Sequence, residues 1–151
     1  MKISIFLPLQ GEIKYDNPVN INGFKDKHSI DNSDPFVIKY NGIYYLIYST
    51  NNYVGCDEQR PGTVIMIDKL LDMFTLEGDP KLLVKPSLDQ EMFESNRFDD
   101  GRDWHTIEGG FYLKKNDNSY LMYSGNAYTH YNYFVAYSKT YAKHNEISEF
   151  K

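Results

Sequence analysis

The fold is decided by the stretch "FVIKYNGIYYLIYSTNNY" (Phe36–Tyr53), which returns 75 residues later as "FYLKKNDNSYLMYSGNAY" (Phe111–Tyr128). Aligned without a gap, nine of the eighteen positions are identical. In each copy, two runs typical of strands flank a turn, and the Asn41-Gly42 turn of the first copy is a strong β-hairpin signal. A short β unit that recurs along a chain predicts a repeat architecture.

Further strand signals extend both copies. The segments "GTVIMID" (62–68) and "LEGDPKLLVK" (76–85) predict a third strand, a turn and a fourth strand, and "YFVAYSK" (133–139) predicts the third strand of the second copy. The segment "DKLLDMF" (68–74) predicts a single helical turn at most. Repeated antiparallel meanders of four short strands predict an all-β fold and favour a β-propeller over a sandwich.

The number of repeats indicates an incomplete propeller. The 75-residue period exceeds the roughly 40 to 50 residues of one blade, and we expect the excess, residues 86–106, to form a polar surface loop. About two blades fill the 151 residues, whereas closed propellers have roughly four to eight. The alternatives are a fragment, an assembly of chains or another β arrangement. We favour a single, truncated propeller domain over residues 1–151.

Composition restricts the partners. The chain has 16 basic and 21 acidic side chains and no basic run, which disfavours nucleic acid and anionic membranes as partners. No apolar run approaches the roughly 20 residues of a membrane span. A single cysteine, Cys56, and a first segment without the features of a secretory signal predict a cytoplasmic protein. The oligomeric state stays open.

Glu108 is the first candidate for catalysis. In a propeller, residues at the head of the first strand of each blade converge on one channel, and Glu108 stands three residues before its phenylalanine. Hydrolysis of a glycosidic bond needs a carboxylic acid that protonates the leaving oxygen and a carboxylate that activates water. The apolar or small neighbours in "TIEGGF" predict a desolvated carboxyl with a raised pKa. Gly109 and Gly110 are expected to leave space for a ligand.

Asp34 is the candidate partner acid. It stands two residues before the phenylalanine of the first copy, in the position that we expect to match Glu108. Because Asp34 precedes Pro35, a role in a turn competes with a catalytic role. Asp31 competes with Asp34 for the same function.

Four residues are candidates for binding substrate: Trp104, His105, Asp31 and Tyr128. The indole of Trp104 could stack on a sugar ring or simply pack at a strand edge. The histidines have no metal-ligand spacing, so no metal site is predicted. Tyr128 ends the second repeat and could reach a substrate, but Tyr53 holds the same place in the first repeat. A tyrosine at this place in both copies favours a structural role in the blade over a role in binding.

The stretches "DPFVIKYNGIYYLIYST" (34–50) and "RDWHTIEGGFYLKKNDNSYLMYSGNAYTHYNYFVAYS" (102–138) resemble the family 43 glycoside hydrolases, five-bladed propellers that act on arabinan and xylan. The resemblance implies that Glu108 is the general acid. It also implies that Asp34 or Asp31 is either the general base or an aspartate that tunes the pKa of the acid. The implied reaction is inverting hydrolysis of oligosaccharides that contain arabinose or xylose.

Two alternatives to that reaction stay open: a fragment that binds carbohydrate without cleaving it, and a related propeller enzyme acting on fructans or mannosides. No cofactor is implied apart from calcium, which the family can hold, and the sequence identifies no ligands for it.

Overall fold

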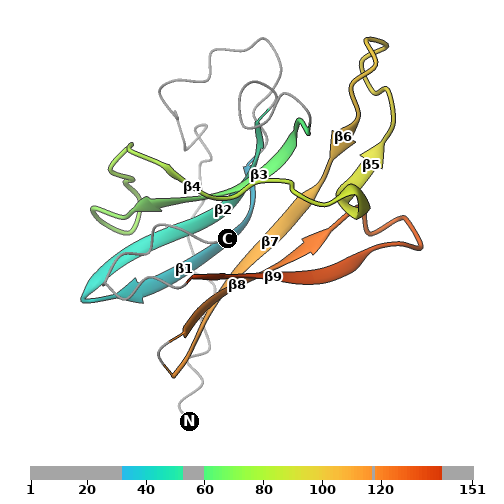
Figure 1. Cartoon of the computed structure of the whole chain (residues 1–151). Helices are drawn as coiled ribbons and strands as arrows, with labels where there is room; N and C mark the ends of the chain where they lie inside the picture. The colour runs from blue at the N-terminus through green and yellow to red at the C-terminus, as the bar shows by residue number, and fades with distance from the viewer. Residues whose placement is uncertain (1–31, 53–59, 117, 141–151) are drawn as a thin grey trace.

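The computed structural model describes residues 32–52, 60–116 and 118–140 (Figure 1). Asp31 and Cys56 lie outside these ranges. Within them the chain consists of strands, turns and one short 3-10 helix, η1 (Asp89–Glu91). The all-β prediction is therefore confirmed. Among the residues described, no helix is long and apolar enough to cross a membrane.

The first sheet contains the predicted antiparallel meander of β1 (Asn32–Tyr40), β2 (Ile43–Asn52), β3 (Gly62–Lys69) and β4 (Lys81–Val84). Asn41 and Gly42 connect β1 to β2 with φ values of 48° and 83°. Positive φ at both central residues is what a tight hairpin turn of this kind requires. After β3, the backbone N–H of Phe74 and the hydroxyl of Thr75 bond to Asp72, which closes a turn in place of the helical turn predicted there.

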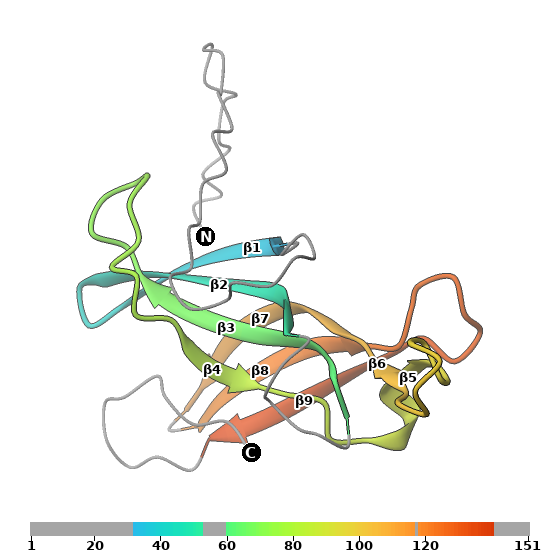
Figure 2. The ribbon, with the colours of Figure 1, turned by 90° about the horizontal axis from the view of Figure 1, so that it is seen from above.

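The second sheet contains the predicted second meander of β7 (Ile107–Lys115), β8 (Asn118–Gly125) and β9 (Phe134–Thr140). All three strands are antiparallel to their neighbours. The two sheets lie face to face as two layers (Figure 2). Stacked antiparallel meanders of this kind form part of a β-propeller.

Residues 86–106 were predicted to form a surface loop, but they also contain regular structure. They contain η1 and two short strands, β5 (Met92–Glu94) and β6 (Trp104–His105), and β6 adds to the first sheet parallel to the start of β3. This addition depends on Gly62, because a Cβ atom there would lie 1.9 Å from the carbonyl oxygen of His105. A buried pairing between segments so far apart in sequence has no local signal.

The core fills the space between the two sheets. Ile47 and Ile65 of the first sheet and Ile107 and Leu121 of the second are completely buried there. Gly110 of β7 permits this close approach, since an added Cβ would lie 2.7 Å from the side chain of Ile65. The first sheet therefore fills the space beside Gly110. The expectation that Gly110 leaves room for a ligand was wrong.

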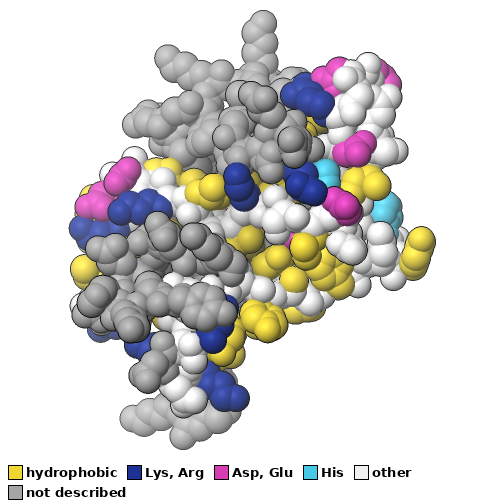
Figure 3. Space-filling view, viewed as in Figure 1, with side chains coloured by type: hydrophobic (Ala, Val, Ile, Leu, Met, Phe, Trp, Pro, Cys, Tyr) yellow, Lys and Arg dark blue, Asp and Glu magenta, His cyan; other side chains and the backbone are white. Residues whose placement is uncertain are grey.

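The other face of the second sheet is apolar and exposed. Phe111, Leu113, Val135 and Tyr137 all have 43% or more of their surface accessible. In Figure 3, hydrophobic side chains gather over the region that β8 and β9 occupy in Figure 1.

Two glycine substitutions test how closely the segments approach. Gly110→Ala should lower the free energy of unfolding by about 1–3 kcal/mol, the usual cost of overpacking a core. Gly62→Ala should cost more, because its methyl group would meet backbone and not the movable end of a side chain. Chemical denaturation measures both. A substitution that leaves the stability unchanged or raises it would show that this glycine lies further from its neighbour, Ile65 for Gly110 or His105 for Gly62.

Candidate functional site

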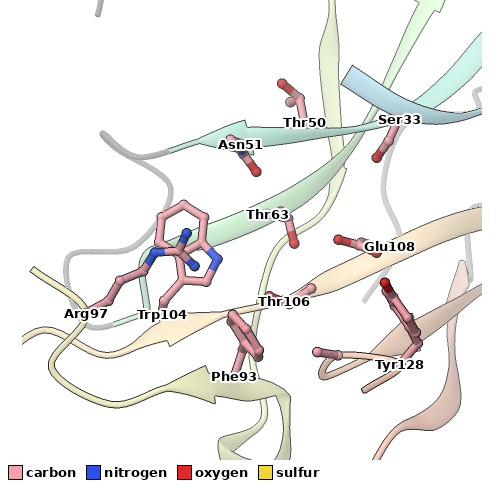
Figure 4. Close-up of a pocket in the computed structure, with 11 residues that line it drawn as sticks. Ser33, Thr50, Asn51, Thr63, Phe93, Arg97, Trp104, Thr106, Glu108 and Tyr128 are labelled. Carbon is pink, nitrogen blue, oxygen red and sulfur yellow. The ribbon is translucent and has the colours of Figure 1, made fainter. Parts of the chain in front are cut away.

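A pocket of about 290 Å³ opens where the two sheets meet the segment 86–106 (Figure 4). Both sheets and this segment contribute to its wall. The lining residues are Ser33, Thr50, Asn51, Thr63, Phe93, Arg97, Trp104, Thr106, Glu108, Ala127 and Tyr128. The lining thus combines aromatic rings with hydroxyl and amide groups, one carboxyl group and one guanidinium, and a few polar groups among apolar ones are typical of small-ligand pockets.

Glu108 is held in place by hydrogen bonds on both sides of it. The hydroxyl of Thr63 accepts a bond from the backbone N–H of Ile107 at 2.8 Å and donates one to its carbonyl oxygen at 2.9 Å. The backbone N–H of Gly109 donates to the hydroxyl of Ser49 at 3.2 Å. The backbone around Glu108 is thus tied to the first sheet, and its carboxyl group points into the pocket (Figure 4).

The surroundings of Glu108 favour its protonated form. Burial raises the pKa of the Glu108 carboxyl, and the negative charge of Asp34 raises it further. The expectation that small and apolar neighbours would desolvate this carboxyl is confirmed. A carboxylic acid that keeps its proton to a higher pH is suited to protonate a leaving group.

Asp34 and Glu108 do not hold the same position in the two repeats, and that part of the sequence analysis was wrong. Each first strand has a β-bulge just before the phenylalanine of its repeat, and the paired register places Ser33 at the position of Glu108. Asp34 matches Gly109, and both have positive φ, 53° and 69°. Because the bulge is the same in both copies, the offset of one residue between the two acids lies in the sequence itself.

Asp34 nevertheless lies within electrostatic reach of Glu108, as the pKa of Glu108 shows. Its carboxylate accepts a hydrogen bond from the hydroxyl of Ser33 at 3.2 Å. Asp34 is exposed and does not line the pocket, whereas Ser33 does. Asp31, the competing candidate, falls outside the described residues.

Trp104 lines the pocket but is only 6% exposed. The guanidinium of Arg97 lies 4.9 Å from the centre of a Trp104 ring, and the ring of Phe98 packs edge-on at 5.8 Å. His105 is buried beside it and does not line the pocket. Burial lowers the pKa of His105.

Tyr128 is 82% exposed at the mouth of the pocket, with its hydroxyl directed toward Glu108 (Figure 4). The structure therefore brings Glu108, Trp104 and Tyr128 to one pocket and places the charge of Asp34 near it. His105 stays outside the lining. The roles assigned to these residues remain predictions.

Glu91 of η1, which was not predicted as a site residue from the sequence, is completely buried. Its carboxylate accepts hydrogen bonds from the backbone N–H groups of Ser87 and Leu88 at 2.6 and 2.8 Å, and from the hydroxyl of Tyr123 at 3.1 Å. These bonds connect the start of the segment 86–106 to β8. The bond with Tyr123 spans 32 residues, so no local sequence pattern shows it.

Asn126 connects the same segment to the end of β8. Its buried side-chain amide donates hydrogen bonds to the carbonyl oxygens of Gln90 and Met92, at 3.0 and 2.8 Å. The matching residue of the first repeat, Asn51, lines the pocket instead. The two equivalent asparagines thus make different contacts, one with the pocket and the other with the segment 86–106.

The described residues contain no group of three or more His, Cys, Asp or Glu side chains that could hold a metal ion. No chemical step is assigned to the calcium ion that the resemblance allows.

Comparisons with known proteins bear on the fold. No protein-family model and no curated protein matches the chain. Among solved structures, a thermostable family-43 glycoside hydrolase matches with 23% identity and a TM-score of 0.59, covering 83% of this chain and 38% of its own. The fold is that of a family 43 glycoside hydrolase.

Two other solved structures are similar. An endo-1,4-beta-xylanase from Bacteroides thetaiotaomicron is 23% identical, with a TM-score of 0.56, and the match covers 77% of this chain and 35% of that one. An alpha-L-arabinofuranosidase from Lactobacillus brevis is 20% identical, with a TM-score of 0.60, over 80% of this chain and 34% of that one. The resemblance noted in the sequence is confirmed for the fold, and the chain spans little more than a third of these proteins.

The anchoring of Glu108 can be tested at Thr63. Thr63→Val keeps the shape of the side chain but leaves the buried backbone groups of Ile107 without their partner. The free energy of unfolding should fall by about 1–3 kcal/mol. Thr63→Ser keeps the hydroxyl and should stay closer to wild type in the same denaturation experiment. An unchanged stability of Thr63→Val would show that the bonds of the hydroxyl do not anchor this strand.

The raised pKa of Glu108 predicts a pH-dependent stability. The folded state keeps this proton at pH values where the unfolded chain has released it, so the stability that the group contributes falls as pH rises through that window. Glu108→Gln cannot titrate, and its stability relative to wild type should therefore increase from pH 4 to pH 7. Denaturation curves at the two pH values measure this. A difference that does not change with pH would contradict the raised pKa.

Proposed function

We propose that this chain forms the acid-bearing part of an inverting glycoside hydrolase, with Glu108 as the general acid. The observation that carries the proposal is a half-buried carboxyl group that points into a pocket and has a raised pKa. Protonation of the glycosidic oxygen by Glu108 would let the leaving group depart as an alcohol. The glycosidase-like fold supports this assignment.

We assign the partner carboxylate to Asp34 or Asp31. The charge of Asp34 already raises the pKa of Glu108, which is the effect expected of an aspartate that keeps the acid protonated. In an inverting enzyme the base stands roughly 6.5–9.5 Å from the acid and activates a water molecule on the opposite face of the sugar. An aspartate at this place would therefore serve either as tuner or as base.

The proposed substrates are short oligosaccharides that contain arabinose or xylose. The volume of about 290 Å³ is at the lower end of the roughly 300–1,000 Å³ typical of small-ligand pockets. A pocket of this size suits one end of a saccharide better than a long stretch of chain. The names of two structural neighbours, a xylanase and an arabinofuranosidase, agree with pentose-containing substrates.

A second candidate function is binding of the saccharide without cleavage. Glu108 is the only carboxylate among the described residues that line the pocket, since Asp34 stands outside the lining. A site with an acid but no positioned base would hold a sugar and leave its bond intact.

Glu108→Gln decides between these functions. Hydrolysis of natural oligosaccharides should fall by about 10²–10⁴-fold, the usual contribution of a general acid, while aryl glycosides with good leaving groups should lose far less. The measurement is release of reducing ends and of aryl alcohol from arabinosyl and xylosyl substrates. Glu77→Gln is the matched control, because Glu77 pairs with Lys69 and is not among the residues that line the pocket.

Full activity of Glu108→Gln on natural oligosaccharides would overturn the assignment of the acid. Saturable binding by the wild-type chain, without any hydrolysis, would favour the binding function. An absence of both would overturn both proposals.

A further inference from the structure

We propose that Arg97 forms a subsite for the carboxylate of a uronic acid residue on the bound saccharide. This inference rests on the proposed function and narrows its substrate class to acidic oligosaccharides. Arg97 lines the same pocket as Glu108, and the acid chemistry makes no use of it. In Figure 4 the two side chains lie at opposite ends of the pocket.

Aromatic rings fix the orientation of the Arg97 guanidinium. Its centre lies 4.9 Å from a ring of Trp104 and 5.9 Å from the ring of Phe93. A cation against the face of a ring is attracted by the ring electrons, and a guanidinium can keep such contacts while its N–H groups bind a planar partner. The two rings therefore restrict where this side chain lies.

The described residues give Arg97 only one weak ionic partner. Its nearest carboxylate oxygen, on Glu94, is 3.6 Å away, beyond the usual range of about 2.7–3.2 Å for a hydrogen bond. The two side chains are 38% and 51% exposed, and exposed pairs contribute little. Donors of the guanidinium thus remain available to a ligand.

The charge of the pocket favours an anion. Arg97 and Glu108 are the two charged side chains among its described lining residues. Glu108 must be protonated to act as the acid, and it is then neutral. Arg97 remains as a positive charge within a lining of hydroxyl, amide and aromatic groups, for which a neutral sugar offers no counter-charge.

A uronic acid carboxylate is the anion that fits best. A guanidinium and a carboxylate are both planar and form two parallel N–H···O hydrogen bonds, which gives direction as well as affinity. Because Arg97 and Glu108 stand at opposite ends, a saccharide held by its carboxylate at Arg97 would extend toward Glu108. The side chains of Ser33, Asn51 and Thr106 along the pocket could meet its hydroxyl groups.

The test compares three ligands by calorimetric titration of the full chain. They are a xylo-oligosaccharide that carries one hexuronic acid, the same compound with the carboxylate methyl-esterified, and the unsubstituted oligosaccharide. Wild type should bind the free acid on the order of tenfold more tightly than the ester. Added salt should reduce this preference, since it screens the ion pair.

Variants connect the preference to Arg97. Arg97→Met should remove the tenfold difference and leave binding of the ester and of the neutral sugar within about twofold of wild type. Arg97→Lys keeps the charge without the paired geometry and should retain part of the preference. Arg102→Met is the matched control, because Arg102 belongs to the same segment, contacts Asp100 and does not line the pocket.

The outcomes separate this inference from the proposed function. Equal binding of acid and ester by wild type would overturn the uronate subsite and leave the glycosidase proposal intact. A preference that persists in a folded Arg97→Met variant would also overturn it. Failure of wild type to bind or cleave any of the three ligands would count against the proposed function as well.

Discussion

The position of Glu108 depends on the hydrogen bonds between the Thr63 hydroxyl and the backbone of Ile107. They join the third strand of one sheet to the first strand of the other, one residue before the acid. Gly110 lets the same strand approach the isoleucines of the first sheet closely enough for these bonds to form. Without this junction the two meanders would still be sheets, but the carboxyl group would have no fixed place.

The packing that stabilises the two sheets also determines the chemistry of the pocket. Burial at the junction removes water from the Glu108 carboxyl and raises its pKa, and the nearby charge of Asp34 acts in the same direction. At the other end of the pocket, the guanidinium of Arg97 lies against two aromatic rings. One pocket thus contains a carboxyl group with a raised pKa at one end and a guanidinium at the other.

The two repeats build this asymmetry from one backbone plan. Both first strands carry the same β-bulge, yet Ser33 occupies in one copy the place that Glu108 occupies in the other. The equivalent asparagines have diverged in the same way, one lining the pocket and the other fastening the segment 86–106. The two copies share one backbone geometry, and different residues or contacts at matched positions make their surroundings different.

The sequence by itself determined the strands, the hairpins and the desolvation of the Glu108 carboxyl group. These follow from alternating patterns, turn residues and immediate neighbours, which act over a few residues. Only the tertiary structure decided the burial of Trp104 and His105 and the contacts of Thr63 and Arg97. Those features depend on contacts between distant residues, such as Thr63 and Ile107, which are 44 residues apart. Such a contact cannot be predicted from neighbouring residues, because they do not specify which distant residue will pack against them.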